Sequence, residues 1–140
     1  MDKDWHSAVE PCHIVDSADQ ITWSDSAEVL VIGLGAAGVA CALQSLELGQ
    51  SVLALDRFGG GGATVASGGV IYAGGGTAMQ KQAGIDDCPE AMFEYLKREV
   101  GNIVTESTLL DFCNQSAPTI QWMINNGVEF RADYWPEKTS

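Results

Sequence analysis

The chain has 140 residues, enough for one modest domain with a core, since 46% of them are hydrophobic. Seven basic residues stand against nineteen acidic ones, and the formal net charge of -12 disfavours nucleic acid and anionic membrane as partners. No apolar run approaches the ~20 residues of a membrane span, and the first residues lack a basic region followed by an apolar core, so no secretory signal is expected.

Residues 1–27 are polar and contain Pro11 together with several aspartates and serines. We expect them to form a leader that is partly ordered at best. Within the leader, residues 21–23 are the candidate for a short strand or for packing at the edge of the domain that follows.

A strand, a tight turn and a helix are expected next. Val29–Ile32 is a short continuous apolar run, which is typical of a parallel strand buried on both faces. Gly33, Gly35 and Gly38 fit the pattern G-x-G-x-x-G. The first glycine permits the sharp turn, the second lets the backbone approach a pyrophosphate, and the third lets the helix pack close to the strand. The N-terminus of the helix offers unpaired N–H groups and a partial positive charge to phosphates.

The helix should run from about Ala36 to Leu48, with Gly49 as its stop, and a second strand is expected over Val52–Leu55. Asp56 stands at the end of this second strand, where its carboxylate can accept hydrogen bonds from an adenosine ribose. The sequence of strand, turn, helix, strand and acid favours a dinucleotide site over an α/β turn that binds no ligand.

Nine of the sixteen glycines fall between residues 59 and 76. Such a segment can be a flexible linker. However, apolar side chains worth burying lie between the glycine clusters, and backbone amides without side chains suit a flat cofactor that lies close to the main chain. No G-K-[ST] pattern follows, so this is not a nucleotide-triphosphate loop.

Three helices and a strand are expected after the glycines. The first helix starts at a capping box over residues 87–90 and ends at Gly101. The second spans residues 105 to about 115, the third begins at residues 116–118 and stops at 126–127, and residues 128–130 begin another strand. The apolar positions of the helices predict core packing rather than cofactor contacts. The side chains expected to face inward are Met92, Phe93, Leu96, Val100, Leu109, Leu110, Cys113, Ile120, Trp122, Met123 and Ile124.

The cysteines and histidines do not indicate a metal site. The four cysteines form no C-x-x-C pair and predict reduced, mostly structural thiols in a cytoplasmic protein. Both histidines, His6 and His13, lie in the polar leader, where Cys12 and scattered acids are the only other candidate ligands.

Residues 23–130 resemble the N-terminal FAD-binding part of the fumarate reductase and 3-ketosteroid dehydrogenase flavoproteins. Four segments carry the resemblance, namely 28–38, 53–57, 61–69 and 122–130. The glycine-rich segment 67–77 is most similar to the 3-ketosteroid Δ4-dehydrogenase branch.

The resemblance implies an α/β fold, a Rossmann-like FAD-binding domain of the glutathione-reductase type with a parallel sheet, truncated before the capping domain. It divides the chain into the leader at 1–27, the N-terminal portion of the FAD-binding domain at 28–127, and the start of the capping region at 128–140. The residues that the pattern and the resemblance place against FAD are Gly33, Gly35, Ala36, Ala37, Gly38, Asp56, Arg57, Ala63, Thr64, Ser67, Gly68 and Gly69.

The implied function is an FAD-dependent oxidoreductase that transfers hydride between flavin N5 and a carbon next to a carbonyl, with a small-molecule substrate. A steroid is expected, and a dicarboxylate, as in fumarate reductase or succinate dehydrogenase, is the alternative. A non-catalytic dinucleotide-binding module and an NAD-binding domain without flavin also remain open.

The catalytic acids and bases of the family belong to regions that lie outside this sequence. Tyr72 is a tempting acid, but a partly buried aromatic side chain beside the flavin is the better interpretation, because nothing nearby would perturb its pKa. No catalytic residue is therefore named. FAD is expected to be bound non-covalently, because residues 62–64 occupy the place where covalently linked relatives carry a histidine.

Overall fold

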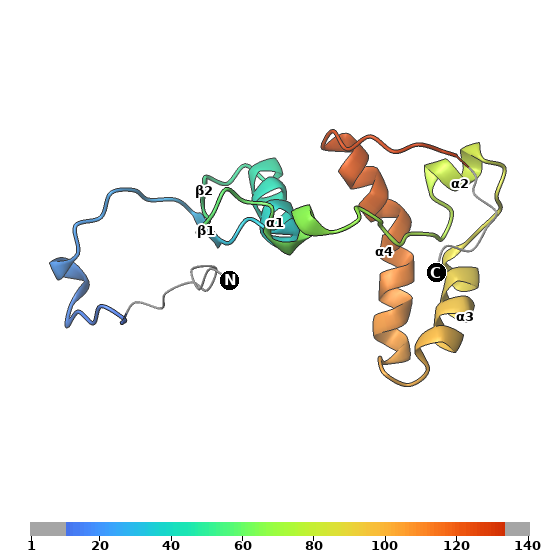
Figure 1. Cartoon of the computed structure of the whole chain (residues 1–140), viewed down its shortest axis with the longest axis horizontal. Coiled ribbons are helices and arrows are strands. Elements are labelled where there is room, and N and C mark those ends of the chain that lie inside the picture. Colours follow the sequence, from blue (N-terminus) through green and yellow to red (C-terminus); the bar gives the residue numbers. More distant parts are fainter. Residues whose placement is uncertain (1–10, 134–140) are drawn as a thin grey trace, which may run out of the picture. The chain divides into compact units, whose positions relative to one another are not determined.

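The computed structural model describes residues 11–133, so the first ten residues of the expected leader and the last seven of the expected capping region lie outside the described part. The chain divides into two compact units, one ending at Gly69 and the other beginning at Val70 (Figure 1). The fold is mixed α/β, with a parallel strand pair in the first unit and helices in the second.

The first unit is built on a strand–helix–strand motif. Strand β1 (Val29–Ile32) pairs in parallel with β2 (Val52–Leu55), residue for residue from Val29 opposite Val52 to Ile32 opposite Leu55. Helix α1 (Ala36–Glu47) connects the two strands and packs against both. Both strands have the predicted bounds, and the helix ends as expected before Gly49, whose φ of +81° is the left-handed conformation of a helix stop.

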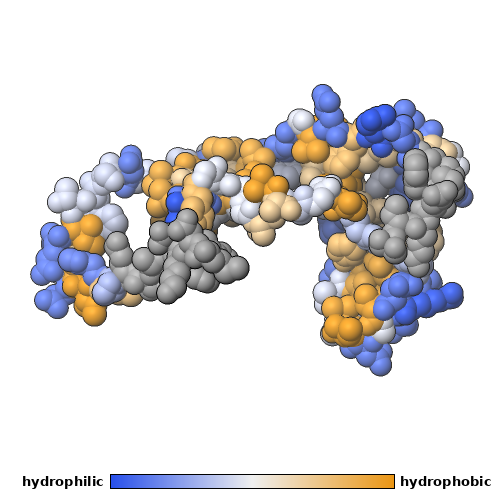
Figure 2. Space-filling view, viewed as in Figure 1, coloured by the Kyte–Doolittle hydropathy of each residue, from blue (hydrophilic) through white to orange (hydrophobic). Residues whose placement is uncertain are grey.

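Only one face of this strand pair is covered within the described residues. Val31 is 6% exposed, and it lies on the α1 side, because a Cβ atom added to Gly38 of that helix would come within 3.4 Å of its Cγ1. Ile32, which points to the opposite face, is 81% exposed. The prediction of burial on both faces is therefore wrong for this part of the chain, since a two-stranded sheet has a helix on one side only. Figure 2 shows apolar side chains at the surface.

Two short 3-10 helices lie in the part of the first unit that the structure describes. The first, η2 (Ala18–Gln20), is capped by the Ser17 side chain, and the second, η3 (Gly62–Ala66), lies in the glycine-rich segment. Residues 21–23 form no strand, so the first of the two alternatives expected for them is wrong, and Ile21 and Trp23 are exposed.

Between residues 70 and 133 the second unit has three helices, α2 (Ala78–Gln82), α3 (Pro89–Val100) and α4 (Glu106–Asn125), of which α3 and α4 pack side by side (Figure 1). An ion pair of 2.7 Å between Lys97 and Glu106 bridges the turn between them. The buried apolar side chains of this unit are Met92, Leu109, Cys113 and Ile120. The prediction that Leu110 faces inward is wrong, because that side chain is 39% exposed.

One continuous helix, α4, replaces the two helices expected over residues 105–126. Pro118 removes one backbone hydrogen bond and costs about 3 kcal/mol in a helix interior. However, the buried residues Leu109, Cys113, Ser116 and Ile120 recur at spacings of four and three, so they form one stripe that passes the proline. Burial of this stripe against the rest of the unit holds the helix together across Pro118.

The capping box lies elsewhere than predicted. Helix α3 begins after Cys88, which makes no side-chain cap, so the prediction of a box over residues 87–90 is wrong. The structure instead has a capping box at α2, where Thr77 and Gln80 cap each other's backbone N–H groups. Residues 128–130 form no strand, which also differs from the expectation.

Candidate functional site

The turn between β1 and α1 has the geometry of a phosphate-binding turn. Gly33 has a φ of +95°, and its N–H donates to the Leu55 carbonyl at 2.7 Å, which extends the strand pairing by one residue. A Cβ atom on Gly38 would lie 1.8 Å from the Gly33 carbonyl oxygen, so α1 approaches the strand closely enough to exclude any side chain there. These positions require glycine, for the physical reasons that the sequence pattern suggested.

The N-terminus of α1 is available to an anion. The first hydrogen bond of the helix runs from Val39 N–H to the Gly35 carbonyl at 2.9 Å, so the N–H groups of Ala36, Ala37 and Gly38 have no partner within the helix. Gly35 makes no side-chain cap, and the first turn carries no acidic side chain that would repel a phosphate.

Asp56 lies at the end of β2, as predicted, and its carboxylate also binds the turn. The N–H of Leu34 donates to Oδ2 at 2.6 Å, and the N–H of Phe58 donates to Oδ1 at 2.8 Å. These two bonds lower the pKa of Asp56 below its ordinary value of 3.8, and the bond from the Leu34 N–H has the larger effect. The contribution of the ionised Asp56 carboxylate to the stability of the fold is therefore present above pH 3.8, and it is lost as the pH falls through the lowered pKa. Each oxygen keeps acceptor capacity for a further donor, such as a ribose hydroxyl.

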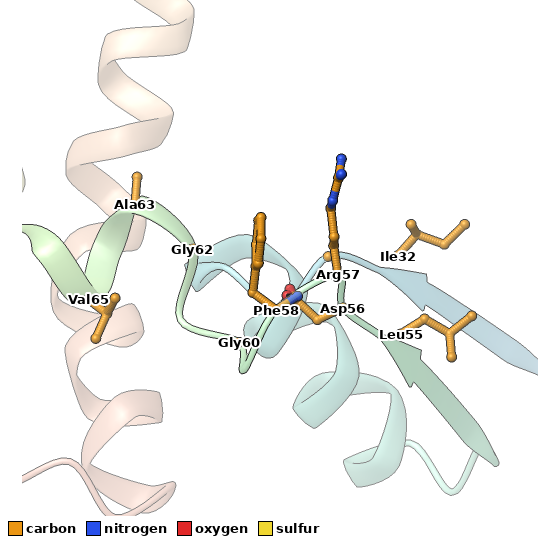
Figure 3. A pocket seen from close by; sticks show the side chains of 10 residues that line it. Ile32, Leu55, Asp56, Arg57, Phe58, Gly60, Gly62, Ala63 and Val65 are labelled. Carbon is orange, nitrogen blue, oxygen red and sulfur yellow. Dashed lines mark hydrogen bonds between the residues drawn. The ribbon is translucent and has the colours of Figure 1, made fainter. Parts of the chain in front are cut away.

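A groove of about 840 Å³ opens at the carboxyl ends of β1 and β2 (Figure 3). In parallel sheets this is the edge where ligands bind. In the loop that follows Asp56, the Phe58 residue is 75% exposed, and the Arg57 guanidinium lies 5.6 Å from the centroid of the Phe58 ring. The groove is lined by Ile32, Gly33, Leu55, Asp56, Arg57, Phe58, Gly60, Gly62, Ala63 and Val65.

The first glycine cluster after β2 packs on the phosphate-binding turn. The Gly61 N–H donates to the Leu34 carbonyl at 2.7 Å, and a Cβ atom on Gly62 would lie 2.9 Å from the Gly35 Cα. Both Gly61 and Gly62 have positive φ angles. The cluster is therefore an ordered part of the site rather than a flexible linker.

The predicted site residues fall into three groups. Four of them line the groove, namely Gly33, Asp56, Arg57 and Ala63. Thr64 lies in η3, and Ser67 closes that turn by donating from Oγ to the Thr64 carbonyl at 2.8 Å and accepting the Gly69 N–H at 3.2 Å. Gly35, Ala36, Ala37 and Gly38 form the turn and the first residues of α1.

Sequence reasoning missed several apolar groove residues, namely Ile32, Leu55, Phe58 and Val65. Ile32 and Leu55 are the last residues of the two parallel strands, so the rule that ligands bind at this sheet edge could have identified them. Phe58 had no such signal, because its position depends on the loop that Asp56 holds.

The comparisons with known proteins agree with this geometry. Residues 28–137 match the family model described as FAD binding domain. The chain belongs to the FAD-binding domain family. This match begins one residue before β1 and includes the phosphate-binding turn, the groove and all three helices of the second unit.

Three relatives show how the family varies. The chain is 41% identical to 3-oxo-5-alpha-steroid 4-dehydrogenase of Comamonas testosteroni over 90% of its residues, which is 24% of that protein. It is 31% identical to a cytochrome-type fumarate reductase of Shewanella frigidimarina over 75% of its residues and 18% of that protein. The crystal structure of 3-ketosteroid-delta4-(5alpha)-dehydrogenase from Rhodococcus jostii RHA1 matches with a TM-score of 0.76 and 40% identity over 85% of this chain. The FAD-binding chain spans about a quarter of the length of the two steroid dehydrogenases.

FAD fits the residues present in this FAD-binding chain. The turn offers backbone N–H groups, and a side chain at Gly38 or Gly62 would fill space that the backbone already occupies. In the part of the chain that the structure describes, no helix has the length and apolarity to cross a membrane, and no three His, Cys, Asp or Glu side chains gather as metal ligands would.

Proposed function

We propose that this chain holds FAD in an oxidoreductase that acts on a carbon–carbon bond next to a carbonyl. The observation that carries the proposal is the groove at the carboxyl ends of β1 and β2, bounded by the glycine turn and by Asp56. The chemistry that FAD supplies when bound is hydride transfer at the flavin N5 atom.

Each part of the site has a role in the proposal. The N–H groups of Gly35 to Gly38 bind the pyrophosphate, and Asp56 accepts the ribose hydroxyls. Arg57 and Phe58 line the groove, where we assign Arg57 to the adenosine and Phe58 to an apolar wall. By the family resemblance, Thr64 and residues 67–69 would lie along the pyrophosphate and flavin, and Ala63 lines the groove.

No catalytic acid or base is assigned within residues 11–133. Asp56 already accepts hydrogen bonds from two backbone N–H groups. The expectation that nothing perturbs the pKa of Tyr72 is wrong, because partial burial raises it, and the phenol therefore stays protonated at neutral pH and cannot serve as a base there. We propose that residues 128–140 begin the capping region and that the acid–base groups lie in segments beyond this sequence. A cytoplasmic location is also part of the proposal, supported by the four cysteines, all of which have free thiols.

The proposed substrate is a 3-ketosteroid. The support is the 41% identity to a 3-oxo-5-alpha-steroid 4-dehydrogenase and the fold match to a dehydrogenase solved with 4-androstene-3,17-dione. The 31% identity to fumarate reductase keeps a dicarboxylate as the second candidate. The test is to assay the natural polypeptide that carries these residues for oxidation of a 5α-3-ketosteroid with an artificial electron acceptor and, separately, for reduction of fumarate with an artificial electron donor. Oxidation of a 5α-3-ketosteroid without fumarate reduction supports the proposal, and fumarate reduction alone refutes the steroid assignment.

Asp56→Ala is expected to raise the FAD dissociation constant about tenfold to a hundredfold, because one or two charge-assisted hydrogen bonds to the ribose are lost. The substitution also frees the Leu34 and Phe58 N–H groups, so the melting temperature should fall. Asp25→Ala is the control, since it removes the same charge from an exposed position. FAD titrations measure the effect, and equal dissociation constants for the two variants would mean that Asp56 does not face the ribose.

FAD is expected to be released intact by acid precipitation. Covalent attachment in the family uses a histidine, and Gly62, Ala63 and Thr64 stand at those positions. His13 lies in the leader, before η2. Flavin absorbance should therefore appear in the supernatant after the protein is precipitated with acid. Absorbance that stays with the washed pellet would show a covalent link.

A further inference from the structure

Leu34, the residue between the first two glycines of the phosphate-binding turn, is held on both sides by the loop that follows β2. Its N–H donates to Oδ2 of Asp56 at 2.6 Å, and its carbonyl accepts the Gly61 N–H at 2.7 Å. Asp56 and Gly61 stand at the two ends of this loop, which therefore binds the turn at two points. The conformation of the turn thus depends on residues 56–61 as well as on its own glycines.

Gly62 brings the end of this loop against the backbone of the turn. A Cβ atom on Gly62 would lie 2.9 Å from the Gly35 Cα atom and 3.6 Å from the Gly35 nitrogen. The reverse contact is ordinary, because a Cβ atom on Gly35 would lie 3.9 Å from the Gly62 Cα atom. Gly35 also has a φ of -76°, which any residue can adopt. Within the protein, it is therefore residue 62 that has to lack a side chain for the loop and the turn to meet.

This contact lies beside the N–H groups that we assign to the pyrophosphate. Gly35 is the N-cap of α1, so the N–H groups of the first helical turn follow it directly. A shift of Gly35 away from residue 62 would move the start of the helix and redirect these N–H groups. Donors that are held in place before binding favour affinity, because ordering them during binding costs free energy.

We propose that Gly62 is a positioning residue for the pyrophosphate of FAD, an inference that rests on the proposed function. Its close contact with Gly35, together with the two hydrogen bonds to Leu34, holds the turn in the binding conformation before FAD binds. ADP carries the same pyrophosphate and uses the same turn. FAD and ADP should therefore depend on Gly62 to the same extent.

Gly62→Ala in the natural polypeptide, after its flavin has been removed, is expected to raise the dissociation constants of both FAD and ADP about tenfold to a hundredfold. The new methyl group separates residue 62 from Gly35, and binding has to force the turn back. Gly49→Ala is the matched control. Gly49 also has a positive φ, +81° against +53° at Gly62, but no atom lies within 4 Å of a Cβ atom added there. Both variants should melt at a lower temperature, because alanine is strained at a positive φ, whereas only Gly62→Ala should bind FAD and ADP more weakly.

Hydrogen exchange of the flavin-free protein, measured by mass spectrometry, tests the same contact without any ligand. The N–H groups of Leu34 and Gly61 should exchange slowly in the unsubstituted protein and in Gly49→Ala, and faster in Gly62→Ala. Fast exchange of both groups in the unsubstituted protein would overturn the positioning role, even if Gly62→Ala fails to fold.

Two results of the titrations would also overturn the positioning role and leave the proposed function intact. One is equal dissociation constants for folded Gly62→Ala and Gly49→Ala, and the other is a Gly62→Ala protein that loses affinity for FAD but not for ADP. An unsubstituted protein that binds no FAD would overturn both the positioning role and the proposed function.

Discussion

Gly38→Ala is expected to weaken FAD binding at least a hundredfold and to destabilise the strand–helix–strand motif. The new Cβ atom would lie 1.8 Å from the Gly33 carbonyl oxygen and 3.0 Å from the Gly33 carbonyl carbon. Both are backbone atoms of the turn that follows β1 and cannot move aside as a side chain could, so α1 has to move away from the strand. Overpacking of this kind costs about 1–3 kcal/mol or more, and the displaced helix no longer directs its N–H groups at the pyrophosphate. The FAD dissociation constant should rise at least a hundredfold, which corresponds to roughly the upper part of this range of free-energy cost.

Gly59→Ala is the matched control for this substitution. No atom lies within 4 Å of a Cβ added at Gly59, and its φ is not in the positive range. Thermal unfolding and FAD titration of the two variants measure the difference. If Gly38→Ala has the same melting temperature and the same FAD dissociation constant as Gly59→Ala, α1 does not approach the turn as closely as described.

The isolated chain of residues 1–140 is expected to show no steroid oxidation and no fumarate reduction, even with added FAD. Hydride transfer needs the substrate carbon at roughly 3–3.5 Å from N5 and a proton donor or acceptor within hydrogen-bond reach. The groove contains only two charged residues, Asp56 and Arg57. Asp56 is engaged by the Leu34 and Phe58 N–H groups, so it is a poor candidate for proton transfer.

The exposed sheet face adds to this expectation. Leu30 and Ile32 are 55% and 81% exposed on the face that α1 does not cover, and such a surface favours aggregation of the isolated chain. The assay supplies FAD and either a 3-ketosteroid with an artificial electron acceptor or fumarate with an artificial electron donor. Turnover that copurifies with residues 1–140 would refute the prediction and direct attention to Tyr72, Thr77 and Arg57.

The phosphate-binding turn could be predicted from the sequence because its glycines are each required by local geometry. Gly33 needs a positive φ, and Gly38 has no space for a Cβ atom. These constraints act over a few residues, so spacing alone identifies them. The bounds of β1 and β2 follow from the same short apolar runs.

The features that were missed depend on contacts between distant residues. Asp87 has the right spacing for a capping box, but its carboxylate binds Gly75 and Gln80 instead. Pro118 indicates a helix start, but the buried stripe of α4 continues past it. In both cases tertiary packing outweighs a local preference of about 1–3 kcal/mol. The spacing of residues in the sequence reveals the local preference but not the tertiary packing. The Asp56–Leu34 bond likewise depends on the register of β1 against β2.

The most direct test of the account is a competition titration of the natural polypeptide that carries these residues, after its flavin has been removed. FAD binding is followed by the flavin absorption near ~450 nm, in the absence and presence of ADP. Because the turn, Asp56 and the groove are assigned to the ADP half, ADP should displace FAD competitively, and NAD should bind far more weakly than FAD. Tight binding of NAD without binding of FAD, or FAD binding that ADP does not affect, would contradict the assignment of this site.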